Sequence, residues 1–375
     1  MSRADAACGE AAFELCLARL CDPDADLKAK AHAAGAIYRR VMDAHDPSSA
    51  ESPRKLSERI VRAGALEALV SLLHVGCCYG KVGAVRTLIS LLSSADEGSC
   101  IGETVVNAGA LPALVALLRS GDCDGKVEAA GVLVSIAVEH ELSARVLDAG
   151  ALPALVESLE HGSPACKLAA AGALAALTDE QSLRGAVVGA RALPGLIALL
   201  TAGGDDAQAE AACALSNIAA NAELCAEIVR AAALAPLVAA LSLAPDSKVV
   251  SDAASCICSI AADAELRPAV VDAGALPPLI ALMCHGSDDS KAEAACALCN
   301  IAADKALSKR VVDAGALLPL VALLQRPEPC IGARAPHARA PGSAARSVDE
   351  AGASAARNSA LALDGSSPID ASLGF

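Results

Sequence analysis

Apolar residues recur at intervals of three and four along most of this chain, which is the spacing that one buried face of an α-helix produces. The segment 222–263 shows the pattern clearly. It contains a short amphipathic stretch (AELCAEIVRA), a second apolar stretch (AALAPLVAALSL), a turn (APDS) and a longer third stretch (KVVSDAASCICSIAAD). Pro236 falls in the first turn of the second stretch, where its missing N–H is harmless. The pattern therefore predicts a unit of three helices.

This unit is repeated along the chain. The phrase AGAL, or a variant such as ARAL or AAAL, has its second residue at positions 64, 109, 150, 191, 232, 274 and 315. EAACALSNIAA (Glu210–Ala220) likewise returns as EAACALCNIAA (Glu293–Ala303), two repeats later. Since no single unit can enclose its own apolar face, the units are expected to stack into an all-α solenoid.

The repeat sets the expected organisation of the chain. The tail is rich in Ala, Pro, Gly and Ser without an apolar period, which is typical of disorder. The expected parts are a disordered start at 1–9, an N-terminal helical cap at 10–46, a linker at 47–55, six repeats (56–97, 98–138, 139–180, 181–221, 222–263 and 264–304), a partial capping repeat at 305–326 and a disordered tail at 327–375.

Composition changes how these helices must pack. The chain of 375 residues has no Trp, two Tyr and two Phe, so its core depends on Ala, Leu and Val. Small side chains let helices approach closely. Mean hydropathy is high at +0.47, yet apolar runs such as Ala108–Leu118 are shorter than the ~20 residues that a membrane span needs. We therefore expect no transmembrane segment.

Charge and cysteine content indicate the cellular compartment and the class of binding partner. The net charge is −14, and the tail from residue 326 holds five Arg against five Asp and Glu, so the acidic excess belongs to the body. An acidic body disfavours nucleic acid and favours cationic partners. Sixteen cysteines without an export signal indicate a reducing compartment, the cytoplasm, with the nucleus as the alternative.

At this point the sequence resembles the armadillo repeat family. The resemblance covers roughly residues 10–326. It is carried by the three-helix unit, by DAGALPALVESL (Asp148–Leu159) and its copies, and by EAACALSNIAA, which is close to a family pattern EALWALSNIA. HEAT repeats have a similar length, but they lack the Gly between the first two helices and the three-helix division. The resemblance implies a right-handed α-α superhelix.

Patterns for catalysis or cofactor binding are weak. GDCDGKV (Gly121–Val127) has three residues between its glycines and Val after Lys, so it is not a phosphate-binding P-loop. The pair Cys296 and Cys299 has no second pair at zinc spacing. The seven His are scattered, and no nucleophile elbow is present. We therefore expect that the chain is not an enzyme and that it binds neither a cofactor nor a metal.

The resemblance points to the third helices as a binding surface. In armadillo proteins these helices line the concave groove, and importin-α-like members place Trp and, four residues later, Asn on that face. Here the Trp position holds Arg, Gly, Cys or Ser, and Asn occurs in two repeats; acidic residues stand three positions earlier in four of the six. The candidate groove residues are Glu128, Ser135, Glu210, Cys213, Asn217, Asp252, Ser259, Glu293, Cys296 and Asn300.

Two interpretations of these residues remain open. In one, they line a channel that binds an extended, basic segment of another protein, so that the chain is a scaffold or adaptor. In the other, Asn217 and Asn300 bond the backbone of a neighbouring repeat, and the acids form a solvated face. Alternative functions are a nuclear-import cargo adaptor, which would require Trp–Asn pairs, and the substrate-recognition part of an armadillo-type ubiquitin ligase without its U-box.

Overall fold

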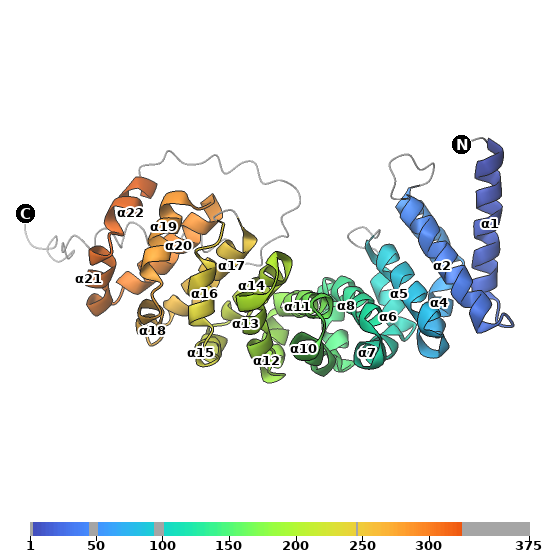
Figure 1. The fold of residues 1–375 in the computed structure, drawn as a ribbon, viewed down its shortest axis with the longest axis horizontal. Coiled ribbons are helices and arrows are strands. Elements are labelled where there is room, and N and C mark those ends of the chain that lie inside the picture. Colours follow the sequence, from blue (N-terminus) through green and yellow to red (C-terminus); the bar gives the residue numbers. More distant parts are fainter. Residues whose placement is uncertain (1–2, 45–51, 94–100, 245–246, 325–375) are drawn as a thin grey trace, which may run out of the picture. The chain divides into compact units, whose positions relative to one another are not determined.

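The protein is a series of α-helices joined by short turns. The computed structural model describes residues 3–44, 52–93, 101–244 and 247–324, and among these there is no β-strand (Figure 1). The chain divides into two compact units, Met1–Gly195 and Leu196–Phe375. Each unit contains its own stack of repeats, so the predicted all-α repeat fold is confirmed.

Unit 1 begins with two long helices and continues with triplets. Its helices are α1 (Arg3–Cys21), α2 (Leu27–Ala44), α3 (Pro53–Arg62), α4 (Ala65–Val75), α5 (Cys78–Ser93), α6 (Ile101–Asn107), α7 (Ala110–Ser120), α8 (Cys123–Ala137), α9 (His140–Asp148), α10 (Ala151–His161), α11 (Pro164–Asp179) and α12 (Arg184–Gly189), with a 3₁₀ turn η1 (Gln181–Leu183) before α12. The following helix, α13 (Ala192–Ala202), contains the division between the units.

Unit 2 continues the same order of two shorter helices followed by a long one. Its helices are α14 (Asp205–Ala219), α15 (Ala222–Arg230), α16 (Leu234–Ala240), α17 (Lys248–Ala262), α18 (Arg267–Asp272), α19 (Leu276–His285), α20 (Asp288–Ala302), α21 (Lys305–Asp313) and α22 (Leu317–Leu324). The last two correspond to the first two helices of a repeat.

Within each unit the third helices of the repeats pack side by side, and in unit 1 the N-terminal helix α2 continues their row. In unit 1, α2 lies against α5, α5 against α8, and α8 against α11; in unit 2, α14 lies against α17, and α17 against α20. Their packed faces consist mainly of Ala, Leu, Ile and Val. Ala211, Leu215 and Ile218 of α14 are all fully buried, as the helical period of EAACALSNIAA predicts.

The turn between the first and second helices explains the recurring AGAL phrase. Gly109, Gly150 and Gly274 have φ of 83°, 77° and 83°, in the left-handed region that glycine enters without strain. Arg191 and Ala232 adopt the same conformation, with φ of 64° and 63°. Those two repeats therefore keep the turn at a conformational cost of roughly 1 kcal/mol each.

Two expected boundaries are wrong. The start at 1–9 was expected to be disordered, but α1 begins at Arg3, because its run of alanines has high helix propensity. The linker at 47–55 ends earlier than expected, because α3 begins at Pro53, which stands at the first helical position where a proline is tolerated. The tail at 327–375 lies outside the described residues, and the exact repeat boundaries remain a proposal.

Candidate functional site

Three acidic side chains occupy equivalent positions on the third helices of unit 2. Glu210 lies on α14, Asp252 on α17 and Glu293 on α20, and all three are half-buried. We call these three residues the acidic row. None of them forms an ion pair with a described residue. The row therefore holds negative charge that the described side chains leave unpaired.

Burial makes this charge costly. It raises the pKa of Asp252 from 3.8 to about 6, the nearby carboxylate of Glu210 adds to the rise, and Lys248 opposes it. Asp252 Oδ2 is buried and has no hydrogen-bond partner among the described residues. Burial also raises the pKa of Glu293, and the charges of Asp289 and Asp252 raise it further. A cation placed against the row would relieve this repulsion.

Glu128, the corresponding acid of unit 1, is paired with an arginine. Arg86 of α5 donates from Nε to Glu128 Oε1 of α8 at 2.7 Å. This hydrogen bond raises the pKa of the Arg86 guanidinium, and the charge of Glu128 adds to the rise. Arg86 stands in the position that would hold Trp in an importin-like repeat. Glu128 is thus already neutralised by the preceding repeat and does not offer an unpaired carboxylate.

Asn300 joins two third helices. Its Nδ2 donates to the backbone oxygen of Cys258 at 3.1 Å and lies 3.7 Å from the Cys258 sulfur. This contact follows the second interpretation above, in which the amide bonds the backbone of a neighbouring repeat. Its Oδ1 accepts no hydrogen bond from a described residue. Asn217, on α14, is half-buried.

The remaining candidates are small side chains. Ser135 donates from Oγ to the Gly131 oxygen of its own helix at 3.2 Å, so its hydroxyl is bonded within α8. Cys213 and Ser259 are half-buried. Cys296 accepts a hydrogen bond from Cys258, which lowers its pKa and raises that of Cys258.

Sequence reasoning missed two of these partners. Arg86 could have been found, because it lies one repeat before Glu128 and its position faces the next third helix. Cys258 could not have been found, because the thiol that contacts Cys296 comes from α17, whereas the sequence pattern pointed to Cys299 of the same helix.

The glycine-containing stretch before α8 is a helix cap. Asp122 accepts a hydrogen bond from the backbone N–H of Gly125 at 2.8 Å. An aspartate in this position satisfies one of the free N–H groups at a helix start. The stretch therefore starts the third helix, and no phosphate-binding role is required to explain it.

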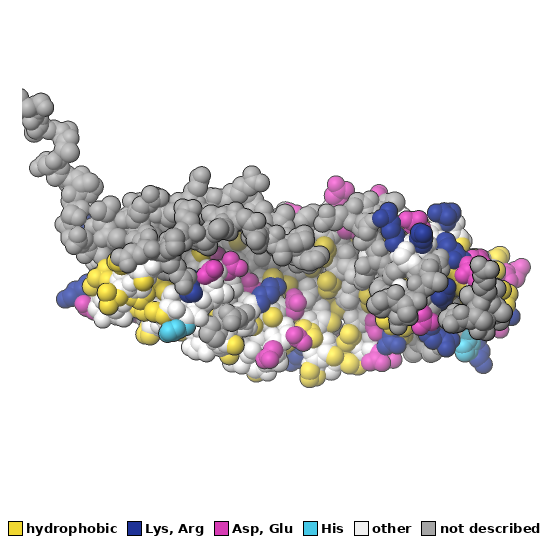
Figure 2. Space-filling model, turned by 90° about the horizontal axis from the view of Figure 1, so that it is seen from above, with side chains coloured by type: hydrophobic (Ala, Val, Ile, Leu, Met, Phe, Trp, Pro, Cys, Tyr) yellow, Lys and Arg dark blue, Asp and Glu magenta, His cyan; other side chains and the backbone are white. Residues whose placement is uncertain are grey.

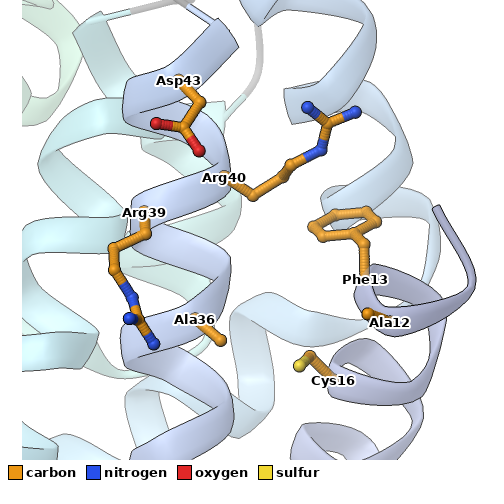
Figure 3. A pocket seen from close by; sticks show the side chains of 7 residues that line it. All are labelled: Ala12, Phe13, Cys16, Ala36, Arg39, Arg40 and Asp43. Atoms are coloured by element: carbon orange, nitrogen blue, oxygen red, sulfur yellow. The ribbon is translucent and has the colours of Figure 1, made fainter. Parts of the chain in front are cut away.

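A cavity of about 290 Å³ lies between α1 and α2 in unit 1 (Figure 3). Arg40 extends beside the ring of Phe13 there, and Arg59 lies over the same ring, 5.2 Å from its centre. Arg40 is also 3.8 Å from the carboxylate of Glu10. These charges are engaged with each other in the N-terminal cap, whose helices carry none of the candidate residues. The cavity is lined by Ala12, Phe13, Cys16, Ala36, Arg39, Arg40 and Asp43.

Charged side chains are unevenly distributed over the described surface. On the face drawn in Figure 2, acidic side chains are interspersed with apolar ones, and Lys and Arg gather most densely at the end that carries the N-terminal helices.

Among the described residues, no group of three or more His, Cys, Asp or Glu is arranged to hold a metal. Nor does any single described helix have the length and hydropathy of a membrane span; two bent helix pairs reach them only in combination.

Comparisons with known proteins agree with this architecture. The family profile of the Armadillo/beta-catenin-like repeat matches residues 103–138, 181–220 and 263–303. A designed armadillo repeat protein, solved in complex with the peptide (KR)4, is 30% identical over 67% of this chain and 99% of its own, with a TM-score of 0.56. The chain belongs to the armadillo repeat family. No curated protein matched this armadillo chain.

Two further solved structures are similar. An engineered protein is 26% identical to this armadillo chain over 95% of it and 89% of its own length, with a TM-score of 0.74. Another designed armadillo repeat protein is 28% identical over 68% of this chain and 99% of its own, with a TM-score of 0.58.

Proposed function

We propose that this armadillo protein is a non-catalytic scaffold that binds an extended, basic segment of another protein along the third helices of unit 2. The observation that carries the proposal is the acidic row, Glu210, Asp252 and Glu293, which forms no ion pair with a described residue and contains a buried Asp252 oxygen without a hydrogen-bond partner among those residues. An armadillo solenoid offers an elongated surface of this kind.

The chemistry of the row selects a cation. Lysine or arginine held between two carboxylates forms charge-assisted hydrogen bonds, which are stronger than neutral ones. Each such contact would also lower the pKa of Asp252 toward its ordinary value and remove the repulsion described above. The designed armadillo neighbour whose partner is the peptide (KR)4 supports the same choice of ligand.

Recognition would differ from that of an importin-like groove. This chain has no Trp, so lysine stems cannot be held between indole rings. Affinity would instead depend on carboxylates, and therefore on salt and pH. This difference favours a scaffold over a nuclear-import adaptor.

The test is a binding titration with a fluorescein-labelled octapeptide of alternating Lys and Arg, followed by fluorescence anisotropy at pH 7.5. The wild-type chain is expected to bind it, and an Asp–Glu octapeptide is expected not to bind. The variant Glu210→Lys/Glu293→Lys is expected to bind at least about tenfold more weakly, a change of about 1.4 kcal/mol.

A matched control separates local contact from overall charge. Glu223 and Glu265 are exposed residues of the same unit outside the third helices, and Glu223→Lys/Glu265→Lys changes the net charge by the same amount. This control is expected to keep most of the affinity. Equal losses in the two double variants would reject the acidic row as the site and leave only a general electrostatic attraction.

A further inference from the structure

Two cysteines from neighbouring repeats meet at the surface of unit 1. Cys123 is the first residue of α8, and Cys166 lies in the first turn of α11. Their sulfur atoms are 3.5 Å apart, although the residues are separated by 43 positions in sequence. Both thiols are reduced in the structure. We propose that Cys123 and Cys166 are a redox modification site, in which a peroxide converts the two thiols into a disulfide that links α8 to α11.

Repeat register produces this juxtaposition. Cys123 is the first residue of its third helix, and Cys166 is the third residue of the next third helix along the chain. Cys166 Sγ also lies 3.7 Å from the Cys123 backbone oxygen, so the two helix starts are in direct contact. A disulfide requires a sulfur–sulfur distance of about 2.05 Å. The two sulfurs must therefore move closer together for the bond to form.

Access and hydrogen bonding assign different roles to the two thiols. Cys123 is exposed, whereas Cys166 is buried, so an oxidant in solution reaches Cys123 first. Ser163 Oγ lies 2.9 Å from the Cys123 sulfur and accepts a hydrogen bond from the Cys166 backbone N–H at 3.3 Å. The Ser163 hydroxyl hydrogen is therefore available to the Cys123 sulfur.

The reaction takes place in two balanced steps. The Cys123 sulfur attacks one oxygen of hydrogen peroxide, the O–O bond breaks, and the products are a Cys123 sulfenic acid and water. The Cys166 sulfur then attacks the Cys123 sulfur, the S–S bond forms, the S–O bond breaks, and a second water leaves with the Cys166 proton. Two thiols are oxidised, and one peroxide is reduced to two waters. A thiol reductant reverses the change.

The structural consequence is local to the second and third repeats. The bond would fix the starts of α8 and α11 to each other, and it would close a loop of 43 positions. Glu128 lies about one turn and a half further along α8. The disulfide would therefore also restrict the distance between α8 and α11 near Glu128. This inference does not depend on peptide binding in unit 2.

The test treats the reduced full chain with a small excess of hydrogen peroxide, alkylates the remaining thiols and maps the peptides by mass spectrometry. We expect a peptide pair joined through Cys123 and Cys166, with the loss of two alkylatable thiols and full recovery after dithiothreitol. Cys284→Ser removes an exposed thiol with no described thiol partner, and it should leave the joined pair unchanged.

Two variants keep the test decisive. In Cys166→Ser, Cys123 should accumulate a dimedone-reactive sulfenic acid, about tenfold above wild type, because the resolving thiol is missing. If that variant fails to fold, Cys123→Ser, which changes an exposed side chain, should abolish the joined pair. Finding Cys123 as stable sulfenic acid in the wild type, or a joined pair between other cysteines, would overturn the proposal.

Discussion

The acidic positions of the third helices behave differently in the two units. In unit 1, Glu128 is paired with Arg86 of the preceding repeat at 2.7 Å. In unit 2, Glu210, Asp252 and Glu293 form no ion pair within the part of the chain that the structure describes, and burial raises the pKa of Asp252 to about 6. In both units the acid stands at the same position of a long third helix.

The residue in the Trp position of the preceding repeat accounts for this difference. Unit 1 has Arg86 there, whereas the repeats before Asp252 and Glu293 have Cys213 and Ser255. A small residue leaves room beside the carboxylate and supplies no charge. The same repeat therefore becomes a closed ion pair or an open anionic site according to one side chain.

The largest expected effect tests whether the two cores are equivalent. Leu133 and Leu215 occupy the same place on α8 and α14 and are 1% and 0% exposed. We expect Leu133→Ala and Leu215→Ala to lower the free energy of unfolding of their own unit by about 2–5 kcal/mol each. Amide hydrogen exchange would locate the loss. If either variant destabilised both units equally, the two units would not unfold separately, and this prediction would be wrong.

The second prediction concerns the stability cost of the acidic row. The folded-state pKa of Asp252, about 6, lies above the ordinary 3.8. The folded protein therefore holds a proton that the unfolded chain releases, and this group's contribution to stability falls as the pH rises from about 4 through 6. Asp252→Asn should raise the free energy of unfolding at pH 7.5 by on the order of 1–3 kcal/mol.

The measurement is urea denaturation at pH 4, 6 and 7.5. The difference between Asp252→Asn and wild type should be close to zero at pH 4 and grow toward pH 7.5. Glu223→Gln, at an exposed site on α15, serves as the control and should show no such trend. A gain that is equal at all three pH values would rule out ionisation of Asp252 as its cause.

The third prediction converts unit 2 to the state of unit 1. Cys213→Arg places a guanidinium where Arg86 stands relative to Glu128, so it should pair with Asp252. Affinity for the Lys–Arg octapeptide should fall about tenfold, or about 1.4 kcal/mol, and the pH trend of the previous prediction should disappear. Anisotropy titrations of Cys213→Arg beside Cys213→Ser provide the comparison; undiminished binding by the arginine variant would argue against the pairing.

The smallest effect separates the two roles left open for asparagine. Asn300 bonds the Cys258 backbone across helices, whereas Ser135, at the corresponding site of α8, bonds its own helix. Asn300→Ala should cost about 0.5–1.5 kcal/mol of stability, and Ser135→Ala should cost less. Chemical denaturation measures both. If Asn300→Ala weakens peptide binding without any loss of stability, the amide serves the partner and not the neighbouring repeat.

Much of the architecture could be predicted because the repeated phrases occur at a nearly constant interval along the sequence. The positions of Ala211, Leu215 and Ile218 in the core follow from helical spacing alone. Helix starts were less predictable. Helix α3 begins at Pro53, inside the segment expected to be a linker. Helix α1 begins at Arg3, inside the segment expected to be disordered.

The sequence by itself determined the family, the three-helix repeat and the third-helix positions of the acids, because each depends on spacing along one chain. Only the tertiary structure decided which of those acids is neutralised, which atom Asn300 bonds and which cysteines meet. Those contacts join residues about 40 positions apart. They depend on how one third helix lies against the next, which spacing within a single helix does not specify.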